Sequence, residues 1–326
     1  MVHARNAIAE ANAALGNGLG GRVLEPSPPA IDDGEYYADD PVATDVAAER
    51  IVSPVDGDLS WADVVAERPD LAAWAAERWL GGPRRLLPIP DGLAEARTAL
   101  HRLATYVIAP ARHRVTGKFG LRWTKGGFGT PFFGDDVQIR VEGDQLIVQE
   151  GDSARATTIT SLAAGAEFIG SDIDGETAAE HDSPPVGDVD ADLGVRAEVT
   201  EFLSSWWGMG TAALEILRAD AASVDPSRVQ MWPGHFDPAI EVGDEDRRAS
   251  YGASPGDGGS IEPYLYISVW WPDRLELDSD DPFWNAEGFT GALLGYGEIA
   301  VADDPVAAAV EFFMNGRDRL LAAAGS

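Results

Sequence analysis

The sequence predicts an α+β fold, in which antiparallel strands form a sheet or a sandwich and amphipathic helices flank it. Two clusters of strand-like residues lie at 119–148 and 228–271, where apolar and polar side chains alternate as in half-buried strands. Helical periodicity occurs before, between and after them, at 91–108, 196–219 and 305–323. Strands and helices do not alternate regularly, and the chain has neither a dinucleotide-binding glycine fingerprint nor a Walker A loop. An antiparallel arrangement is therefore favoured over a doubly wound parallel sheet.

The N-terminal residues 1–58 are predicted to be an irregular arm, and residues 59–326 a single domain. Residues 4–15 have the spacing of a short helix that ends at Gly16, and 16–58 are rich in Gly, Pro and Asp without periodicity. Ser60 is the expected N-cap of a helix that runs to about Glu67, and 69–80 predicts another. The helix at 91–108 is expected to end before Pro110, where the period changes from 3.6 to 2.

The strand clusters and later helices are predicted from local signals. Glu142-Gly143-Asp144-Gln145 separates two alternating runs and indicates a hairpin connection. Residues 160–169 are expected to form a short helix and 170–194 a loop. The helix at 196–219 is the longest, and Asp304 with Pro305 begins the last one. The inner face of the longest helix is predicted to carry Phe202, Trp206, Met209, Ala213, Ile216 and Leu217.

Composition excludes several classes of function. The chain has 326 residues and a net charge of -31, from 55 acidic and 24 basic side chains. This charge disfavours binding to nucleic acid or to an anionic membrane, since both need clustered cations. The absence of cysteine excludes disulfides, thiolate nucleophiles and cysteine-ligated metals. No run approaches the roughly 18 apolar residues of a membrane span. We expect a soluble, cytoplasmic protein; cofactor and oligomeric state are left open.

A glycine-rich basic segment is the first candidate site. Lys118 and Lys125 are the only lysines of the chain, and Arg122 lies between them. Lys118 and Arg122 would share one face of a strand, and Gly126, Gly127 and Gly129 would let backbone amides approach a ligand. The segment predicts a site for the phosphate or carboxylate of a small ligand. The alternative is that these cations pair with carboxylates across a hairpin.

The segment Trp-Pro-Gly-His-Phe-Asp at 232–237 is the second candidate site. On an extended segment His235 and Asp237 would leave by the same face, roughly 7 Å apart at Cα. Asp237 could orient His235 as a general base, and the pair is the predicted catalytic group of an enzyme. Asp257 and Glu262 could instead join them around a divalent metal. A packed histidine followed by a turn is the structural alternative.

Aromatic side chains complete the predicted ligand site. Trp232, Trp270 and Tyr264 are expected to stack on a ligand, although core packing is the alternative. The leading hypothesis is a protein that binds a small anionic ligand in a cleft between the 117–133 hairpin and the 230–270 block. A hydrolase or lyase that uses His235 with nearby carboxylates, with or without metal, is the second hypothesis. An interaction protein without a pocket is the third, and the sequence does not decide whether the protein is an enzyme.

Four segments resemble those of an uncharacterised family of bacterial proteins. They read Gly-Leu-Arg-Trp-Thr-Lys-Gly-Gly-Phe-Gly-Thr-Pro-Phe-Phe at 120–133, Trp-Pro-Gly-His-Phe-Asp at 232–237, Tyr-Gly-Ala-Ser-Pro-Gly-Asp at 251–257 and Glu-Pro-Tyr-Leu-Tyr at 262–266. The resemblance covers about residues 90–320. It implies one integral domain, and it implies neither an activity nor a catalytic residue.

Overall fold

The computed structural model describes residues 86–323, except 125, 131–132, 134–136, 151–152, 181–182, 228 and 279. The predicted arm at 1–58 and the predicted helices at 60–67 and 69–80 lie outside the described residues, and so does Lys125. Within the described residues, no helix is long and apolar enough to cross a membrane.

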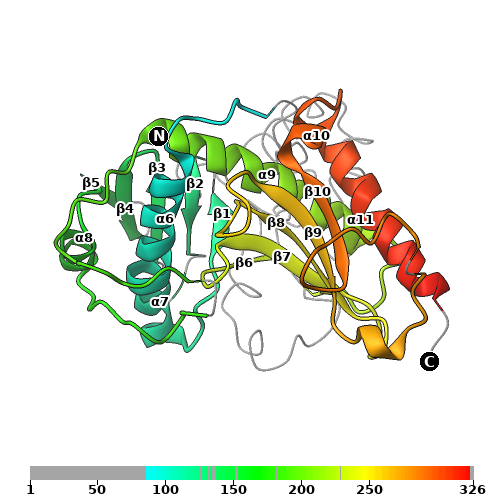
Figure 1. The fold of residues 1–326 in the computed structure, drawn as a ribbon. Helices are drawn as coiled ribbons and strands as arrows, with labels where there is room; N and C mark the ends of the chain where they lie inside the picture. The colour runs from blue at the N-terminus through cyan, green and yellow to red at the C-terminus, as the bar shows by residue number, and fades with distance from the viewer. Residues whose placement is uncertain are drawn as a thin grey trace, which may run out of the picture.

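Two five-stranded antiparallel sheets and the helices around them make up the fold, which confirms the α+β class (Figure 1). The first sheet keeps sequence order and contains β1 (Arg122–Thr124), β2 (Gly127–Gly129), β3 (Val137–Glu142), β4 (Gln145–Glu150) and β5 (Ser153–Thr158). The second contains β6 (Gln230–Trp232), β7 (Asp237–Val242), β8 (Ala249–Ser254), β9 (Tyr264–Val269) and β10 (Gly291–Gly295). The hairpin between β3 and β4 is as expected, with Gly143 at φ 60°, whereas β5 and β10 extend beyond the predicted clusters.

The two sheets meet edge to edge. Leu121 and Met231 form an isolated antiparallel bridge, in which each backbone N–H donates to the other residue's carbonyl, at 2.8 and 2.9 Å. Leu121 directly precedes β1 and Met231 lies in β6, and these are edge strands of the two sheets. The strand order across the molecule is therefore 5-4-3-2-1-6-7-8-9-10, with a single bridge at its centre.

Helices occupy both ends of the described chain and the connection between the sheets. They are α6 (Leu93–Leu103), a π-helical turn (Ala104–Ile108), α7 (Ala109–Thr116), α8 (Leu162–Ile169), α9 (Ala197–Ala219), α10 (Tyr296–Ala300) and α11 (Pro305–Ala322). The helices predicted at 160–169, 196–219 and 305–323 are confirmed as α8, α9 and α11. The loop predicted at 170–194 contains neither helix nor strand among its described residues.

The prediction that the helix at 91–108 ends before Pro110 is wrong. The helix continues through the π-helical turn into α7, with Pro110 in the first turn of α7. Proline has no N–H to give the carbonyl four residues earlier, and the carbonyl of Tyr106 instead accepts from the backbone N–H of Asp174, at 3.1 Å. The wider turn and this outside donor explain how the helix passes the proline.

The first sheet buries an apolar face under α6 and α8. Val141 pairs with Leu146 across β3 and β4. Gly165 brings α8 close to this face and to α6, because a Cβ added to it would lie 3.3 Å from the side chain of Leu103 and 3.5 Å from that of Leu146. The alternating residues of the same strands are polar yet buried. Arg140 donates there to the side chains of Gln138 and Gln149, at 3.4 and 3.3 Å.

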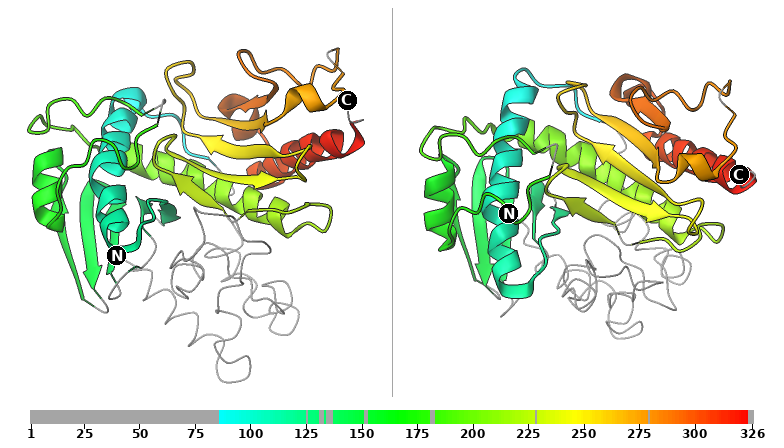
Figure 2. Two further views of the ribbon diagram at one scale, coloured as in Figure 1. Left: turned by 90° about the horizontal axis from the view of Figure 1, so that it is seen from below. Right: turned by 60° about the horizontal axis from the view of Figure 1, so that its bottom comes forward.

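Helix α9 passes along both sheets (Figures 1 and 2). Two of its glycines allow the close approach: a Cβ at Gly208 would lie 3.0 Å from the ring of Trp123 in β1, and one at Gly210 would lie 2.4 Å from the Cβ of Ala253 in β8. The indole N–H of Trp206 donates to the carbonyl of Ser254 at 2.8 Å. Five residues of the predicted inner face are buried, but Ile216 is 42% exposed and that assignment is wrong.

Within the described residues, helices cover one face of the second sheet, and the other face, here called the open face, has no such cover across its strands. Along β9, Leu265, Ile267 and Val269 are buried, whereas Tyr264, Tyr266 and Ser268 between them are half-buried. The covered face packs against α11, where a Cβ at Gly316 would lie 2.1 Å from the side chain of Ile267. The open face bears the polar residues of β8 and β9, and the candidate site lies on it.

Candidate functional site

A cavity of about 840 Å³ lies on the open face of the second sheet, between β7–β9, helix α6 and the loop that follows β8. Its lining combines hydroxyl groups, two carboxylates, two histidines, an arginine and three aromatic rings. The lining residues are Arg97, Thr98, His101, Pro184, His235, Asp237, Ser250, Ser254, Gly256, Asp257, Gly258, Gly259, Tyr264, Tyr266, Ser268 and Phe289.

Strand register places the floor of the cavity. Gly252 pairs with Tyr266 across β8 and β9. The pairs two positions away on either side, Ser250 with Ser268 and Ser254 with Tyr264, lie on the same face of the sheet. A Cβ at Gly252 would lie 2.4 Å from the ring of Tyr266, so the absence of a side chain allows this ring to lie flat across β8. The Tyr266 hydroxyl thereby reaches Asp237, the first residue of β7, and donates to its Oδ2 at 2.7 Å. Asp237 is 2% exposed.

Arg97 of α6 holds the loop between β8 and β9 against the helix. Its Nη1 donates to the carbonyls of Pro255 and Ile261, at 3.1 and 2.9 Å, and its Nη2 donates to the carbonyl of Asp257 at 3.2 Å. Gly256 has φ 92°, the left-handed conformation that glycine adopts at the third position of a type II turn. A Cβ there would lie 2.3 Å from Arg97 Nη1. Burial lowers the pKa of Arg97, although the negative charge of the neighbouring Asp257 acts to raise it.

Asp257 organises this loop from within. Its Oδ1 accepts from the backbone N–H groups of Gly259 and Ser260, at 2.6 and 2.9 Å, and its Oδ2 accepts from the Tyr264 hydroxyl. Burial alone would raise the pKa of Asp257, but these hydrogen bonds and the charge of Arg97 outweigh it, and the pKa is lowered. The pKa of Tyr264 is raised, first by burial and then by its bond to Asp257.

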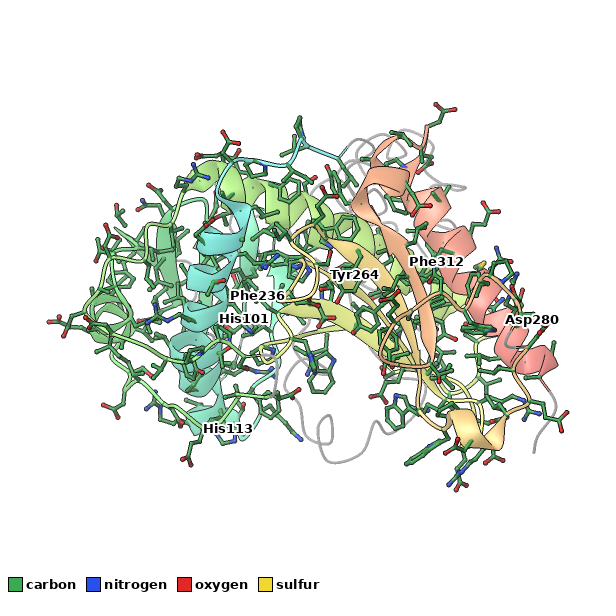
Figure 3. All side chains as sticks on the ribbon, in the orientation of Figure 1. His101, His113, Phe236, Tyr264, Asp280 and Phe312 are labelled. Atoms are coloured by element: carbon green, nitrogen blue, oxygen red, sulfur yellow. The ribbon has the colours of Figure 1, made fainter. Side chains whose placement is uncertain are left out.

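A strained turn precedes β7. Residues 233–236 form it, and Phe236 has φ 60°, a conformation that bulky residues rarely adopt. The ring is fully buried and stacks on His101, with centroids 5.0 Å apart and an interplanar angle of 10°. It also meets Trp207 and Phe128 edge to face, at 4.8 and 5.0 Å. Figure 3 places His101 and Phe236 side by side next to α6, with Tyr264 on the neighbouring sheet.

His101 connects α6 to this turn. Its Nε2 lies 2.8 Å from the carbonyl oxygen of Pro233 and 3.1 Å from that of Gly234. Because carbonyl oxygens only accept hydrogen bonds, Nε2 carries the proton of the neutral ring. Burial lowers the pKa of His101 to about 4, against the two backbone hydrogen bonds, which raise it. The imidazole is therefore neutral near pH 7.

The low pKa of His101 makes a pH-dependent contribution to stability. The unfolded state, with a histidine pKa near 6.5, binds a proton that the folded state excludes, so the contribution is present above pH 6.5 and declines as pH falls toward 4. Between pH 7 and pH 5 we expect the wild type to lose about 2 kcal/mol more free energy of unfolding than His101→Gln loses. Urea unfolding of both proteins at the two pH values measures this, and parallel losses would contradict it.

His235 pairs with a residue that the sequence did not indicate. Its Nε2 lies 2.7 Å from Oε2 of Glu180, in the loop before α9, and both side chains are about one-third exposed. The expected extended segment through His235 and Asp237 is wrong, because His235 lies in the turn and only Asp237 begins the strand. Glu180 thus contacts His235, and Tyr266 contacts Asp237, while the predicted pairing of His235 with Asp237 stays a prediction.

The described residues of the basic segment lie outside the lining of this cavity. Lys118 is half-buried in the loop between α7 and β1, and Arg122 is buried as the first residue of β1. The prediction that they share a strand face is wrong, because the strand begins only at Arg122. Lys125 lies outside the described residues. The cleft described here is formed by α6 and the β8–β9 loop in place of the 117–133 hairpin.

The other predicted ligand residues divide between the cavity and the surface. Tyr264 and Asp257 line the cavity. Trp232 is half-buried with its ring 6.3 Å from that of Phe119. Trp270 is 41% exposed, and its indole N–H donates to the hydroxyl of Ser250 at 2.8 Å. Glu262 is exposed. Trp232, Trp270 and Glu262 do not line the cavity.

Arg97 and His101 are lining residues that sequence reasoning missed. They lie four positions apart on α6, and Thr105, four further on, also donates to the carbonyl of Pro233, at 2.8 Å. Polar side chains at this spacing on the buried face of an amphipathic helix were the available signal. No three His, Asp or Glu side chains among the described residues are grouped so as to hold a metal ion.

In comparisons with known proteins, no family model, no curated protein and no solved structure matches this chain. The resemblance to a bacterial family therefore stays a prediction, and the site has to be interpreted from its own geometry.

Proposed function

We propose that this protein binds a small polar organic molecule in the cavity on the open face of the second sheet. The observation that carries the proposal is the cavity itself: about 840 Å³, within the range of about 300–1,000 Å³ typical of ligand sites. Polar groups from α6, three strands, the turn before β7 and the β8–β9 loop converge on it. Tyr264 and Tyr266 supply flat surfaces, and their hydroxyls are oriented by Asp257 and Asp237.

The described lining of this cavity does not favour the anionic ligand that the sequence predicted. That expectation depended on Lys118, Arg122 and Lys125; Lys118 and Arg122 do not line the cavity, and Lys125 lies outside the described residues. The proposal therefore concerns a small polar ligand bound by hydroxyl groups, carboxylates and aromatic rings.

A thermal-shift screen with neutral sugars, amines and organic acids tests this proposal. A ligand at 100 times its Kd stabilises the folded state by about 2.7 kcal/mol. Ser268→Leu fills the cavity from its floor, and Ala307→Leu enlarges an exposed residue of α11 outside the lining. We expect a hit that Ser268→Leu abolishes and Ala307→Leu retains. A screen without hits, or hits retained by both variants, would contradict the proposal.

A catalytic function is the second candidate, because His235 lines the cavity and is oriented by Glu180 at 2.7 Å. An imidazole held by a carboxylate is the usual arrangement of a general base. In this version the protein is a hydrolase or lyase that uses His235 as the base. Turnover of a screening hit, followed by NMR over hours, should be lost in His235→Gln and slowed in Glu180→Gln. A hit that stays unchanged with the wild type would exclude this version for that ligand.

A further inference from the structure

We propose that the ligand is a small protonated amine, whose ammonium group binds beside Asp237 and the rings of Tyr264 and Tyr266. This inference rests on the proposed function and names the chemical class of its ligand. Three properties of the lining lead to it: its charge, the direction of its hydrogen-bond donors and the arrangement of its rings.

The charge of the lining favours a cation. Among the described lining residues, Asp237 and Asp257 contribute two carboxylates, and Arg97 contributes one guanidinium group. His101 is neutral near pH 7, and His235 lies against the carboxylate of Glu180. The net charge of the chain, -31, adds a long-range attraction for cations. An anion would therefore meet more negative than positive groups among the described lining residues.

The guanidinium of Arg97 is not oriented to bind an anionic ligand. Both of its terminal nitrogens donate to backbone carbonyls of the β8–β9 loop, in three hydrogen bonds of 2.9–3.2 Å. A guanidinium that receives a carboxylate or phosphate usually presents two parallel donors to it. Here those donors are directed at the loop, so the function of Arg97 is to shape the cavity wall.

The two tyrosine hydroxyls present acceptors to a ligand. A hydroxyl has one proton, and Tyr266 donates it to Asp237 while Tyr264 donates it to Asp257. Each phenol oxygen therefore meets a ligand as an acceptor, and that of Tyr264 also has a hydrogen bond with the side chain of Ser254. Together with the carboxylates, these oxygens form a set of acceptors that suits a ligand rich in N–H donors. A primary ammonium has three such donors, whereas a quaternary ammonium has none.

The rings of the same residues can contact a cation directly. Tyr264 and Tyr266 are two positions apart on β9, their centroids are 6.4 Å apart, and their planes are inclined by 60°. Phe289 adds a third ring to the lining. Cations bind over aromatic faces within about 6 Å of the ring centroid. Inclined rings whose hydroxyls bind carboxylates thus provide both an electrostatic and a geometric match to an ammonium group.

Four probes of equal chain length test the inference: butylammonium, butyltrimethylammonium, butan-1-ol and butyrate. NMR titration of the wild-type protein should show butylammonium binding at least about tenfold more tightly than the alcohol and the carboxylate, with the quaternary probe weaker than the primary amine. Butanol or butyrate binding as tightly, at a site that Ser268→Leu abolishes, would overturn the amine inference and leave the proposed function standing. Wild-type protein that binds none of the probes would also overturn the inference, while the metabolite screen decides the proposed function separately.

Two lysine substitutions separate local from general attraction. Thr98→Lys introduces a cation at an exposed position of α6 that lines the cavity, and Val115→Lys introduces the same charge at a position of α7 that is 61% exposed and outside the lining. Butylammonium should bind at least about tenfold more weakly to Thr98→Lys than to Val115→Lys. Equal affinities would show that the acidic surface attracts the amine without this site, and would overturn the inference. Asp237→Asn, checked for folding by circular dichroism, should reduce binding at least as much as Thr98→Lys does.

Discussion

Replacement of Phe236 by alanine is expected to lower the free energy of unfolding by about 4 kcal/mol, as for other large aromatic side chains removed from a core. The ring is fully buried against His101, Phe128 and Trp207, so its removal leaves a cavity that three other rings line. Urea denaturation followed by circular dichroism measures the change.

A second substitution at Phe236 tests the strained backbone. At most buried positions glycine is less stable than alanine, but Phe236 has φ 60°, where a Cβ costs about 1–2 kcal/mol. Phe236→Gly should therefore be more stable than Phe236→Ala by about 1 kcal/mol. Alanine equal to or better than glycine would show that the turn does not impose this conformation on the chain.

Gly256→Ala is expected to lower the free energy of unfolding by about 3 kcal/mol. The new Cβ would lie 2.3 Å from Arg97 Nη1 and 2.7 Å from the carbonyl oxygens of Ser260 and Ile261, at a φ of 92°. Left-handed backbone costs about 1–2 kcal/mol for a residue with a Cβ, and displacing Arg97 weakens hydrogen bonds worth about 1.5–3 kcal/mol each. The variant should also lose the binding of any cavity ligand, because Arg97 shapes the wall.

The same loop offers a matched control for this prediction. Gly258 is two residues away, and a Cβ added there would meet nothing within 4 Å. Gly258→Ala should therefore change the free energy of unfolding by less than about 0.5 kcal/mol. In an Arg97→Met background, Gly256→Ala should have a smaller effect than in the wild type, since the group it displaces is gone. Equal effects in both backgrounds would contradict the proposed contact between Gly256 and Arg97.

The parts of the fold that the sequence predicted are those with local signals. Helices α8, α9 and α11 follow from periodicity and from caps such as Asp304, whose side chain accepts from two amides of the first turn. The continuation of the helix at 91–108 through Pro110 could not be predicted, because it depends on a hydrogen bond from the backbone N–H of Asp174, in a distant loop, to the carbonyl of Tyr106. Strand β5 was missed because its sequence, Ser-Ala-Arg-Ala-Thr-Thr, lacks the large apolar residues of a typical strand.

The site was predicted in part for the same reason. Tyr264 and Asp257 lie in one turn-and-strand segment, and their type and spacing indicated a polar surface. Arg97 makes its contact with Pro255 across 158 positions of sequence, and such a pairing leaves no trace in a single chain. The register that brings Tyr266 to Asp237 depends likewise on three strands, and no local pattern specifies it.

The position of α9 has a consequence for how the chain acquires its structure during synthesis. The strands of the first sheet are complete by Thr158, but Trp123 packs against Gly208 and Leu121 pairs with Met231. A nascent chain must therefore extend through about 75 further residues before the edge of its first sheet is closed. Contacts of such long range slow folding. The early strands thus remain open to pairing with other chains until β6 leaves the ribosome, and a truncation within the 170–194 loop would make this exposure permanent.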